Sequence, residues 1–221
     1  MDMTVKDPGL PPVFLESLQR KSGVILFAGT LESGLKETMD GALKGASDRK
    51  MVAWADALKT GLPSSTLIAI PPHADIDLEA VLRQAEAGHL VLWLMHAPTP
   101  LTALRRILSF QAADARRHLL ARFADQILLM SGQMRVASIA GNGVAVFEMI
   151  LMTPVLKEAL TRESLVEFDT GLREGVEGSG IVSYNQSLLQ LLLRRTIDIK
   201  AAFEATRDPM NLDQILKKVG I

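Results

Sequence analysis

The first two-thirds of the chain carries short, unbroken blocks of apolar residues. Blocks of this length predict strands, and blocks without polar alternation predict strands that are buried on both faces of a parallel sheet. The predicted strands are Val24–Ala28, Thr66–Ile70, His89–His96, Gln126–Met130, Arg135–Ile139 and Gly143–Ile150. Glycines predict turns at Gly132 and over residues 141–143.

Apolar residues at helical spacing predict helices between and after these strands. Asp75 or Asp77, for example, can cap a helix that Gly88 ends. The predicted helices are Val13–Gln19, a helix after the first strand that ends near Gly45, Lys50–Lys59, Asp77–Gly88, Pro98–Phe110, Ala112–Ala124, Val155–Thr161, Glu163–Glu174, Tyr184–Thr196, Ile199–Thr206 and Asn211–Val219. The alternation of strands and helices predicts an α/β fold, followed by a mostly helical section.

Composition narrows the class of protein. The chain has 221 residues, a formal net charge of −1 and no cysteine, which excludes disulfides, thiolate metal sites and a cysteine nucleophile. The charge gives no reason to expect a nucleic-acid partner. No apolar run approaches the roughly 20 residues of a membrane helix, and residues 1–12 do not resemble a signal peptide. We therefore expect a cytoplasmic protein with no membrane-spanning segment.

The segment after the first predicted strand has the layout of a phosphate-binding loop. The pattern requires two glycines separated by four residues, then Lys, then Ser or Thr. Gly29 and Gly34 have this spacing, but Leu35 holds the Lys position and Lys36 holds the hydroxyl position. The Lys would contact phosphates and the hydroxyl would bind Mg²⁺. The degenerate nucleotide-binding residues are Gly29, Thr30, Ser33, Gly34, Leu35 and Lys36.

Two interpretations of this loop remain open. Its backbone N–H groups can form an anion site at a helix N-terminus, with ATP as the expected ligand. Alternatively, the glycines form an inherited tight turn, and Glu32 would repel a phosphate there. Lys36 likewise allows two interpretations. It can reach a phosphate although it lies one residue after the motif's lysine position, or its side chain can remain solvated. Binding of Mg²⁺ is not expected, because its hydroxyl ligand is missing.

Four stretches resemble the type II/IV secretion ATPase family, and most of all its PilT/PilU group, the retraction ATPases of type IV pili. The stretches are Gly23–Met39 at the phosphate loop, Asp77–His96, Gly143–Lys157 and Ser183–Leu188. The resemblance implies a RecA-like P-loop NTPase core with a helical C-terminal extension. We expect a lead-in segment over residues 1–22, the core over residues 23–152 and the helical subdomain over residues 153–221.

The resemblance also identifies residues outside the loop. Glu79, Gly88, His89, His96 and Glu148 stand at positions of the family's motifs. It implies that the strand carrying the two histidines lies near the nucleotide and a subunit interface. A metal pair is not expected, because the histidines are seven residues apart on one strand.

The departures from the family concern catalysis. The strand Thr66–Ile70 resembles the family's Walker B strand, but Pro71-Pro72-His73 follows it where an acidic residue is expected. The segment between the loop and Asp77 is shorter than in the family, and we expect no counterpart of the family's amino-terminal domain. Loss of the loop Lys, the loop hydroxyl and the acid together implies negligible hydrolysis.

Three hypotheses follow. The first is a catalytically inactive protein that acts as a regulatory or assembly partner of pilus or secretion ATPase subunits. It would affect twitching motility, form homo-oligomers or mixed oligomers, and contact an inner-membrane pilus platform peripherally. The second is a functional ATP-driven retraction motor in which Lys36 replaces the missing Lys. The third is a diverged remnant without a role.

Overall fold

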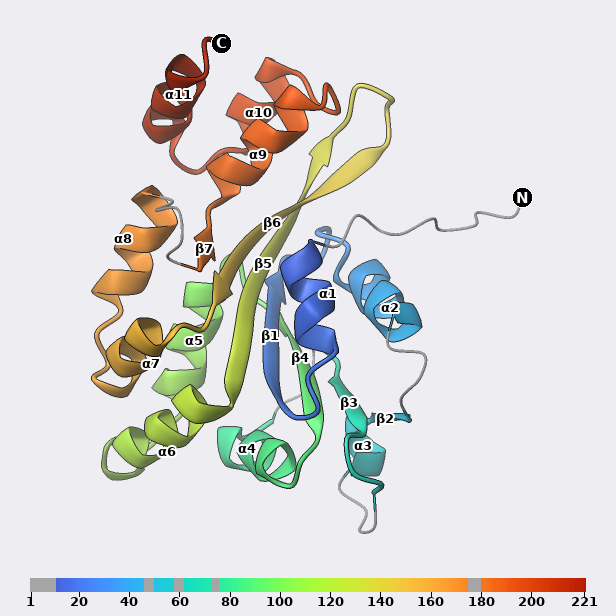
Figure 1. Ribbon diagram of the computed structural model, residues 1–221, viewed down its shortest axis with the longest axis vertical. Coiled ribbons are helices and arrows are strands. Elements are labelled where there is room, and N and C mark those ends of the chain that lie inside the picture. Colours follow the sequence, from blue (N-terminus) through green and yellow to red (C-terminus); the bar gives the residue numbers. More distant parts are fainter. Residues whose placement is uncertain (1–10, 46–49, 58–61, 73–75, 175–179) are drawn as a thin grey trace.

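One mixed sheet forms the centre of the molecule (Figure 1). The computed structural model describes residues 11–45, 50–57, 62–72, 76–174 and 180–221. Its strands are β1 Gly23–Gly29, β2 Met51–Ala53, β3 Leu67–Ile70, β4 Leu90–His96, β5 Ile127–Ala137, β6 Gly143–Leu151 and β7 Ile181–Val182. They lie in the order β2-β3-β4-β1-β5-β6-β7, parallel from β2 to β5, with β6 and β7 antiparallel to their neighbours. The predicted α/β class is confirmed.

Strand β1 is buried on both faces. The helices around the sheet are α1 Pro12–Leu18, α2 Leu35–Gly45, α3 Trp54–Ala57, α4 Leu78–Glu86, α5 Pro100–Ser109, α6 Ala113–Gln126, α7 Pro154–Thr161, α8 Val166–Glu174, α9 Tyr184–Leu193, α10 Ile199–Ala205 and α11 Pro209–Lys218. On one face of β1, Val24, Leu26 and Ala28 point into a core that α4 to α8 cover. On the other face, Ile25 and Phe27 point toward α1 and α2. The unbroken apolar sequence of β1 follows from this burial.

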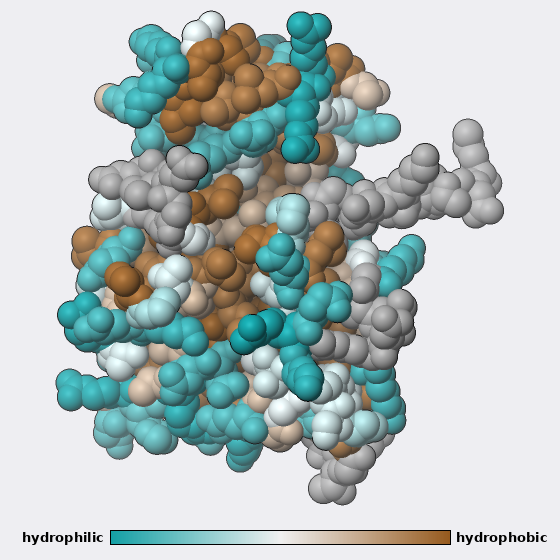
Figure 2. Space-filling view, in the orientation of Figure 1, coloured by the Kyte–Doolittle hydropathy of each residue, from teal (hydrophilic) through white to brown (hydrophobic). Residues whose placement is uncertain are grey.

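The last three helices pack elsewhere. Helices α9 to α11 cover the far half of the long β5–β6 hairpin, where Val136 and Val146 join Leu188 and Leu212 in a separate core (Figure 1). Apolar side chains gather over these helices at the top of Figure 2. The exposed apolar residues there include Leu193, Ile199 and Met210. Of the helices that the structure describes, none has the length and apolar character needed to cross a membrane.

One predicted helix near an end of the sheet is wrong, and one short strand was not predicted. Residues 50–59 were expected to form one helix, but Met51–Ala53 is strand β2, which pairs with β3 through Val52 and Ile68; only the four residues of α3 are helical. Residues 58–61 lie outside the described part of the chain. Within the section expected to be mostly helical, β7 pairs with β6 at Met149 and Ile150. At β2, pairing with β3 outweighed the local helical spacing.

The predicted turn at Gly132 is also wrong. Gly132 lies inside the continuous strand β5, which replaces two of the predicted strands. A Cβ atom at this position would lie 2.7 Å from Pro100 Cδ and 3.0 Å from Tyr184 Oη. The glycine therefore gives two helices, α5 and α9, room to approach the sheet closely.

We expect Gly132→Ala to lower the free energy of unfolding by about 1–3 kcal/mol, because overpacking against a proline ring and a buried tyrosine forces the backbone to shift. Urea unfolding followed by circular dichroism measures the change. Gly143→Ala is the matched control, since its added Cβ would meet only the half-exposed side chain of Arg135, which can move. Equal stability of the two variants would contradict the packing argument.

Candidate functional site

The loop after β1 lies at the carboxyl edge of the sheet, where open α/β sheets bind ligands. Within the loop, the backbone N–H of Ser33 donates to the Thr30 carbonyl oxygen at 3.1 Å. Gly34 then takes a positive φ of 86°, and its carbonyl accepts the N–H of Thr38 as α2 begins. The chain therefore makes a tight turn into a helix N-terminus, as the spacing of Gly29 and Gly34 predicts.

The interior of this turn is filled by its own side chains. Ser33 is buried, and its hydroxyl donates to the Thr30 carbonyl oxygen at 2.7 Å. A Cβ atom at Gly29 would collide with Ser33 Oγ and would lie 3.0 Å from Leu35 Cδ2. The close approach of Ser33 and Leu35 thus requires the glycine.

Leu35 points into the protein core. Its side chain is only 4% exposed and belongs to the same buried cluster as Phe14, Ile25 and Phe27. The position at which the motif requires a phosphate-binding lysine is therefore occupied by a packing residue. Burial of a leucine side chain stabilises the fold by roughly 1.5–3 kcal/mol.

Lys36 lies on the outside of α2. Its side chain is 80% exposed, and its Nζ atom lies 2.8 Å from Asp40 Oδ2, one turn further along the helix. The hydrogen bond to Asp40 raises the pKa of Lys36. The lysine is therefore charged, but in this conformation it is paired along the helix surface.

Gln133 holds the loop against β5, and sequence reasoning missed it. Its Nε2 atom donates to the Ser33 carbonyl oxygen at 2.7 Å, and its Oε1 atom accepts the Thr38 hydroxyl at 2.6 Å. All three residues are buried. We refer to Ser33, Thr38 and Gln133 as the loop clamp. The signal was absent from the sequence because Gln133 follows Ser33 by 100 residues and the β1–β5 pairing brings them together.

A cavity of about 200 Å³ lies beside the loop. Lys36 and Arg135 contribute positive charge to its lining, while Glu32 and Glu37 contribute negative charge. Arg135 Nη1 lies 4.0 Å from Glu37 Oε1, so part of the positive charge is compensated. Arg135 comes from β5 and was not predicted. The balance of charges gives this cavity little net attraction for a polyphosphate.

His96 is the family-motif residue that the fold brings to this cavity. It ends β4 directly opposite Gly29 in the parallel register, and it lines both this cavity and a larger one of about 730 Å³. Among the described residues, its buried Nδ1 atom has no hydrogen-bond partner. His96 therefore lies at the carboxyl end of its strand, beside the loop.

The end of β3 supplies no acid within the described residues. Ile70 is followed by Pro71 and Pro72, and His73 lies outside the described part of the chain. Asp77 stands at the N-cap of α4 and lines the larger cavity, although its side chain makes no capping hydrogen bond. Across the parts of the chain that the structure describes, no group of three or more acidic or histidine residues is arranged to hold a metal.

Three other family-motif residues lie away from the loop. Gly88 and His89 precede β4 and thus lie at the amino edge of the sheet, where His89 is buried. Glu79 accepts a hydrogen bond from Arg122 Nη1 at 2.7 Å, and the same guanidinium binds Glu86. Glu79 therefore links α4 to α6 and does not face the loop.

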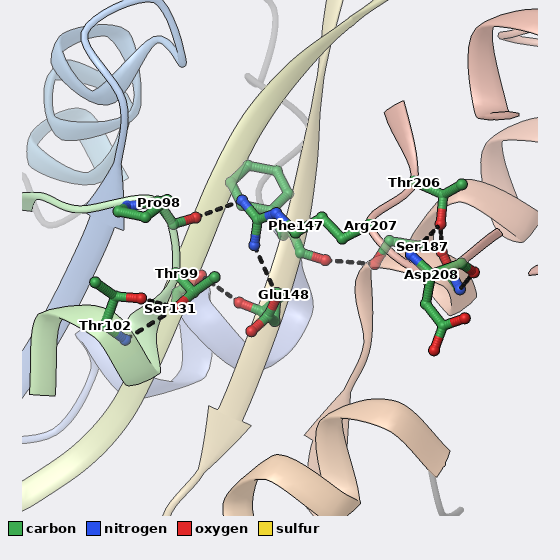
Figure 3. A network of polar contacts seen from close by, with 11 residues as sticks. Pro98, Thr99, Thr102, Ser131, Phe147, Glu148, Ser187, Thr206, Arg207 and Asp208 are labelled. Atoms are coloured by element: carbon green, nitrogen blue, oxygen red, sulfur yellow. Dashed lines mark hydrogen bonds and ion pairs between the residues drawn. The ribbon is translucent and has the colours of Figure 1, made fainter. Parts of the chain in front are cut away.

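Glu148 lies on β6, on the far side of β5 from the loop (Figure 3). It is 5% exposed, and its carboxylate lies 3.6 Å from Arg207 Nη1. Burial raises the pKa of Glu148 to about 7; the charge of Arg207 acts in the opposite direction, and that of Asp169 raises the pKa further. Glu148 and the loop are thus separate sites that share β5 as a wall.

No family model matches the chain, but comparison with known proteins found pilus ATPases that are similar to it. The pilus retraction ATPase PilT of Pseudomonas aeruginosa is 21% identical over 166 residues, which cover 74% of this chain and 48% of that protein. PilU, a pilus ATPase of the same organism, is 28% identical over 137 residues, covering 62% of this chain and 35% of PilU. The matches therefore span less than half of each relative's length.

Solved structures show the same fold. The pilus retraction motor PilT with bound ADP superposes with a TM-score of 0.77 at 19% identity, over 97% of this chain and 71% of that one. The ATPase DotB of Legionella pneumophila gives 0.70 at 16% identity, over 88% of this chain and 62% of DotB. The predicted ATPase fold is confirmed. The chain is thus similar in sequence, at low identity, to the pilus ATPases PilT and PilU, and it shares the fold of PilT and DotB.

Proposed function

We propose that this protein is a non-hydrolysing relative of the pilus retraction ATPases that acts in the cytoplasm as a regulatory or assembly partner of pilus or secretion ATPases. One observation carries the proposal: Leu35 fills the lysine position of the phosphate loop with a buried side chain, while the neighbouring Lys36 faces solvent and pairs with Asp40. The fold of the motor is kept without the side chain that acts on the phosphates.

The missing side chains have a large expected effect on the rate of ATP hydrolysis. Removing a single preorganised donor from an active site costs about 10²–10³ in kcat. Here the loop has neither the lysine nor the following hydroxyl, and the described end of β3 has no acid. Lys36 would have to break its contact with Asp40 and turn back over the loop to compensate. Negligible hydrolysis is therefore the expectation, and Mg²⁺ has no evident ligand at the loop.

The loop clamp supports a structural role for the loop. A bound phosphate would accept hydrogen bonds from the backbone N–H groups of such a loop. In this chain, side chains support the loop through other groups: the Thr30 and Ser33 carbonyl oxygens accept from the Ser33 hydroxyl and from Gln133 Nε2, and the Thr38 hydroxyl donates to Gln133 Oε1. These hydrogen bonds hold the turn in shape without a ligand. ATP would have to bind through the backbone N–H groups of the loop and the small cavity beside it, in which positive and negative charges balance.

A partner protein is supported by the surface of the C-terminal helices. Apolar side chains gather over these helices in Figure 2. The exposed apolar residues of the helices include Leu193 on α9 and Ile199 on α10. Contiguous apolar surface of this kind marks contact sites between proteins. Since the chain shares its fold with PilT, we propose a retraction or secretion ATPase subunit as the partner, with a second copy of this chain as the other candidate.

The proposal predicts that ATP hydrolysis in the presence of Mg²⁺ does not exceed the rate in buffer. Titration with a fluorescent ATP analogue measures whether nucleotide binds at all, and Lys36→Ala should leave any binding unchanged because Lys36 is turned to solvent. Lys44→Ala, at the other end of the same helix, is the matched control. Hydrolysis that Lys36→Ala abolishes and Lys44→Ala preserves would establish the alternative, a functional retraction motor.

The loop clamp predicts a stability effect that does not depend on nucleotide. Gln133→Leu leaves the Thr38 hydroxyl and the Ser33 carbonyl without their buried partner, which should lower the free energy of unfolding by about 1–3 kcal/mol. Urea unfolding without nucleotide measures the loss. Lys36→Ala, which removes only a surface ion pair, should change stability by less than about 1 kcal/mol. A Gln133→Leu variant as stable as the wild type would show that the clamp is not required.

The regulatory role predicts that the purified chain changes the hydrolysis rate of a purified PilT- or PilU-type ATPase from the same cells and co-elutes with it. Leu193→Asp should abolish both effects, because it places a charge in the exposed apolar surface. Val166→Asp, at an exposed apolar position on α8, is the control. An unchanged rate together with separate elution would rule out this partner.

A further inference from the structure

Arg207 connects the C-terminal helices to the rest of the protein. It lies between α10 and α11, and its guanidinium contacts three other segments. It donates a hydrogen bond to the Pro98 carbonyl oxygen ahead of α5 and pairs with Glu148 on β6 (Figure 3). It also lies 4.4 Å from the centroid of the Tyr184 ring on α9. One side chain thus joins the last helices to the sheet and to α5.

The Glu148 carboxylate belongs to a cavity of about 340 Å³ at this junction. The N-cap residues of three helices line the same cavity: Thr99 of α5, Ser183 of α9 and Asp208 of α11. The charged and titratable groups that line it besides Glu148 are Arg105 from α5, Asp169 from α8, Tyr184 from α9, and Arg207 and Asp208 from the segment before α11. Elements from both sides of the junction therefore surround one buried carboxyl group.

Opposing forces act on Glu148. The positive charge of Arg207 and the positive ends of the three helices favour the ionised form. Burial and the nearby Asp169 favour the neutral form, and these two effects outweigh the charge of Arg207, so that the pKa lies near 7. Buried ion pairs commonly have this outcome, since the cost of removing charge from water exceeds the attraction. Burial also raises the pKa of Tyr184, which therefore remains neutral.

We propose that a proton on Glu148 controls how tightly helices α9 to α11 dock onto the sheet and α5. The helices are held firmly while Glu148 is neutral, and they open more often once it is ionised. Opening would expose the carboxyl group to water and return its pKa to about 4.5. The docked state therefore binds the proton more tightly than the open state, so docking weakens as the pH rises from about 4.5 through 7 and changes little above that.

The junction adjoins the loop site through β5. Tyr184 packs against Gly132, and the next residue, Gln133, belongs to the loop clamp. The residue of β5 that contacts α9, Gly132, is therefore the direct neighbour of Gln133, whose side chain holds the loop. The proposal itself needs only the contacts around Glu148 and holds whatever the loop binds.

Amide hydrogen exchange tests the proposal on the full chain. The difference between a pKa of about 7 and the ordinary 4.5 limits the change in the docking equilibrium to about 300-fold. After correction for intrinsic exchange rates, we expect peptides from α9 and α11 to lose protection by about 70-fold between pH 5 and pH 8. Peptides from β1 and β4 should show no comparable loss, because they lie in the core.

Glu148→Gln should remove this pH dependence and leave the helices protected at pH 8. Glu204→Gln is the matched control, since Glu204 is an exposed carboxylate on α10 that pairs with Lys200 at 3.9 Å. It should behave as the wild type. Wild-type protection that is independent of pH, or a Glu148→Gln variant that retains the pH dependence, would overturn the proposal.

A second variant keeps the test valid if Glu148→Gln does not fold. Arg207→Gln removes the charge that favours ionised Glu148, so the midpoint of the transition should move to higher pH. A carboxyl carbon titration by NMR measures the Glu148 pKa directly in the wild type. A value near that of an exposed glutamate, or an unshifted midpoint in Arg207→Gln, would refute the mechanism.

Discussion

The central position of β1 fixes where the loop after it lies and which residues surround that loop. Because β1 pairs in parallel with β4 on one side and β5 on the other, its end fixes the place of the loop at the carboxyl edge of the sheet. The same pairing brings His96 from β4 and Gln133 from β5 to either side of that loop. A one-residue slip of β1 would exchange the side chains that pack on its two buried faces, so the fit to the helices on each face holds these neighbours in register.

The loop after β1 has the glycine spacing of a phosphate-binding loop, but Leu35 and Lys36 occupy the positions of its lysine and its hydroxyl residue. Gly29 and Gly34 still allow the tight turn, but Ser33, Leu35 and Gln133 now supply its contacts from within the protein. Side chains that pack or form buried hydrogen bonds stabilise the turn permanently, whereas a phosphate does so only while bound. The turn therefore has support that does not depend on a nucleotide, in line with the partner role proposed above.

Strand β5 joins two buried polar groups of different character. Gln133 is neutral, and both ends of its amide have hydrogen-bond partners, so it fixes its surroundings at any pH. Glu148 on the neighbouring strand is ionisable, and its cation lies 3.6 Å away, beyond good hydrogen-bond distance. In the same low-dielectric interior, Gln133 therefore keeps its contacts at any pH, whereas the charge of Glu148 changes with pH. The docking of the C-terminal helices depends on Glu148.

The sequence by itself determined the α/β class, most of the strands and helices, and the spacing of the phosphate loop, because apolar runs, capping residues and glycines are local signals. It did not reveal β2 or the continuity of β5, because the pairing of Val52 with Ile68 and the packing of Tyr184 over Gly132 join distant segments. The inward turn of Leu35, the clamp by Gln133 and the contact of Arg207 with Glu148 were likewise decided only by tertiary structure. Burial and charge pairing act between residues that the chain order separates, and only the folded sheet brings them together.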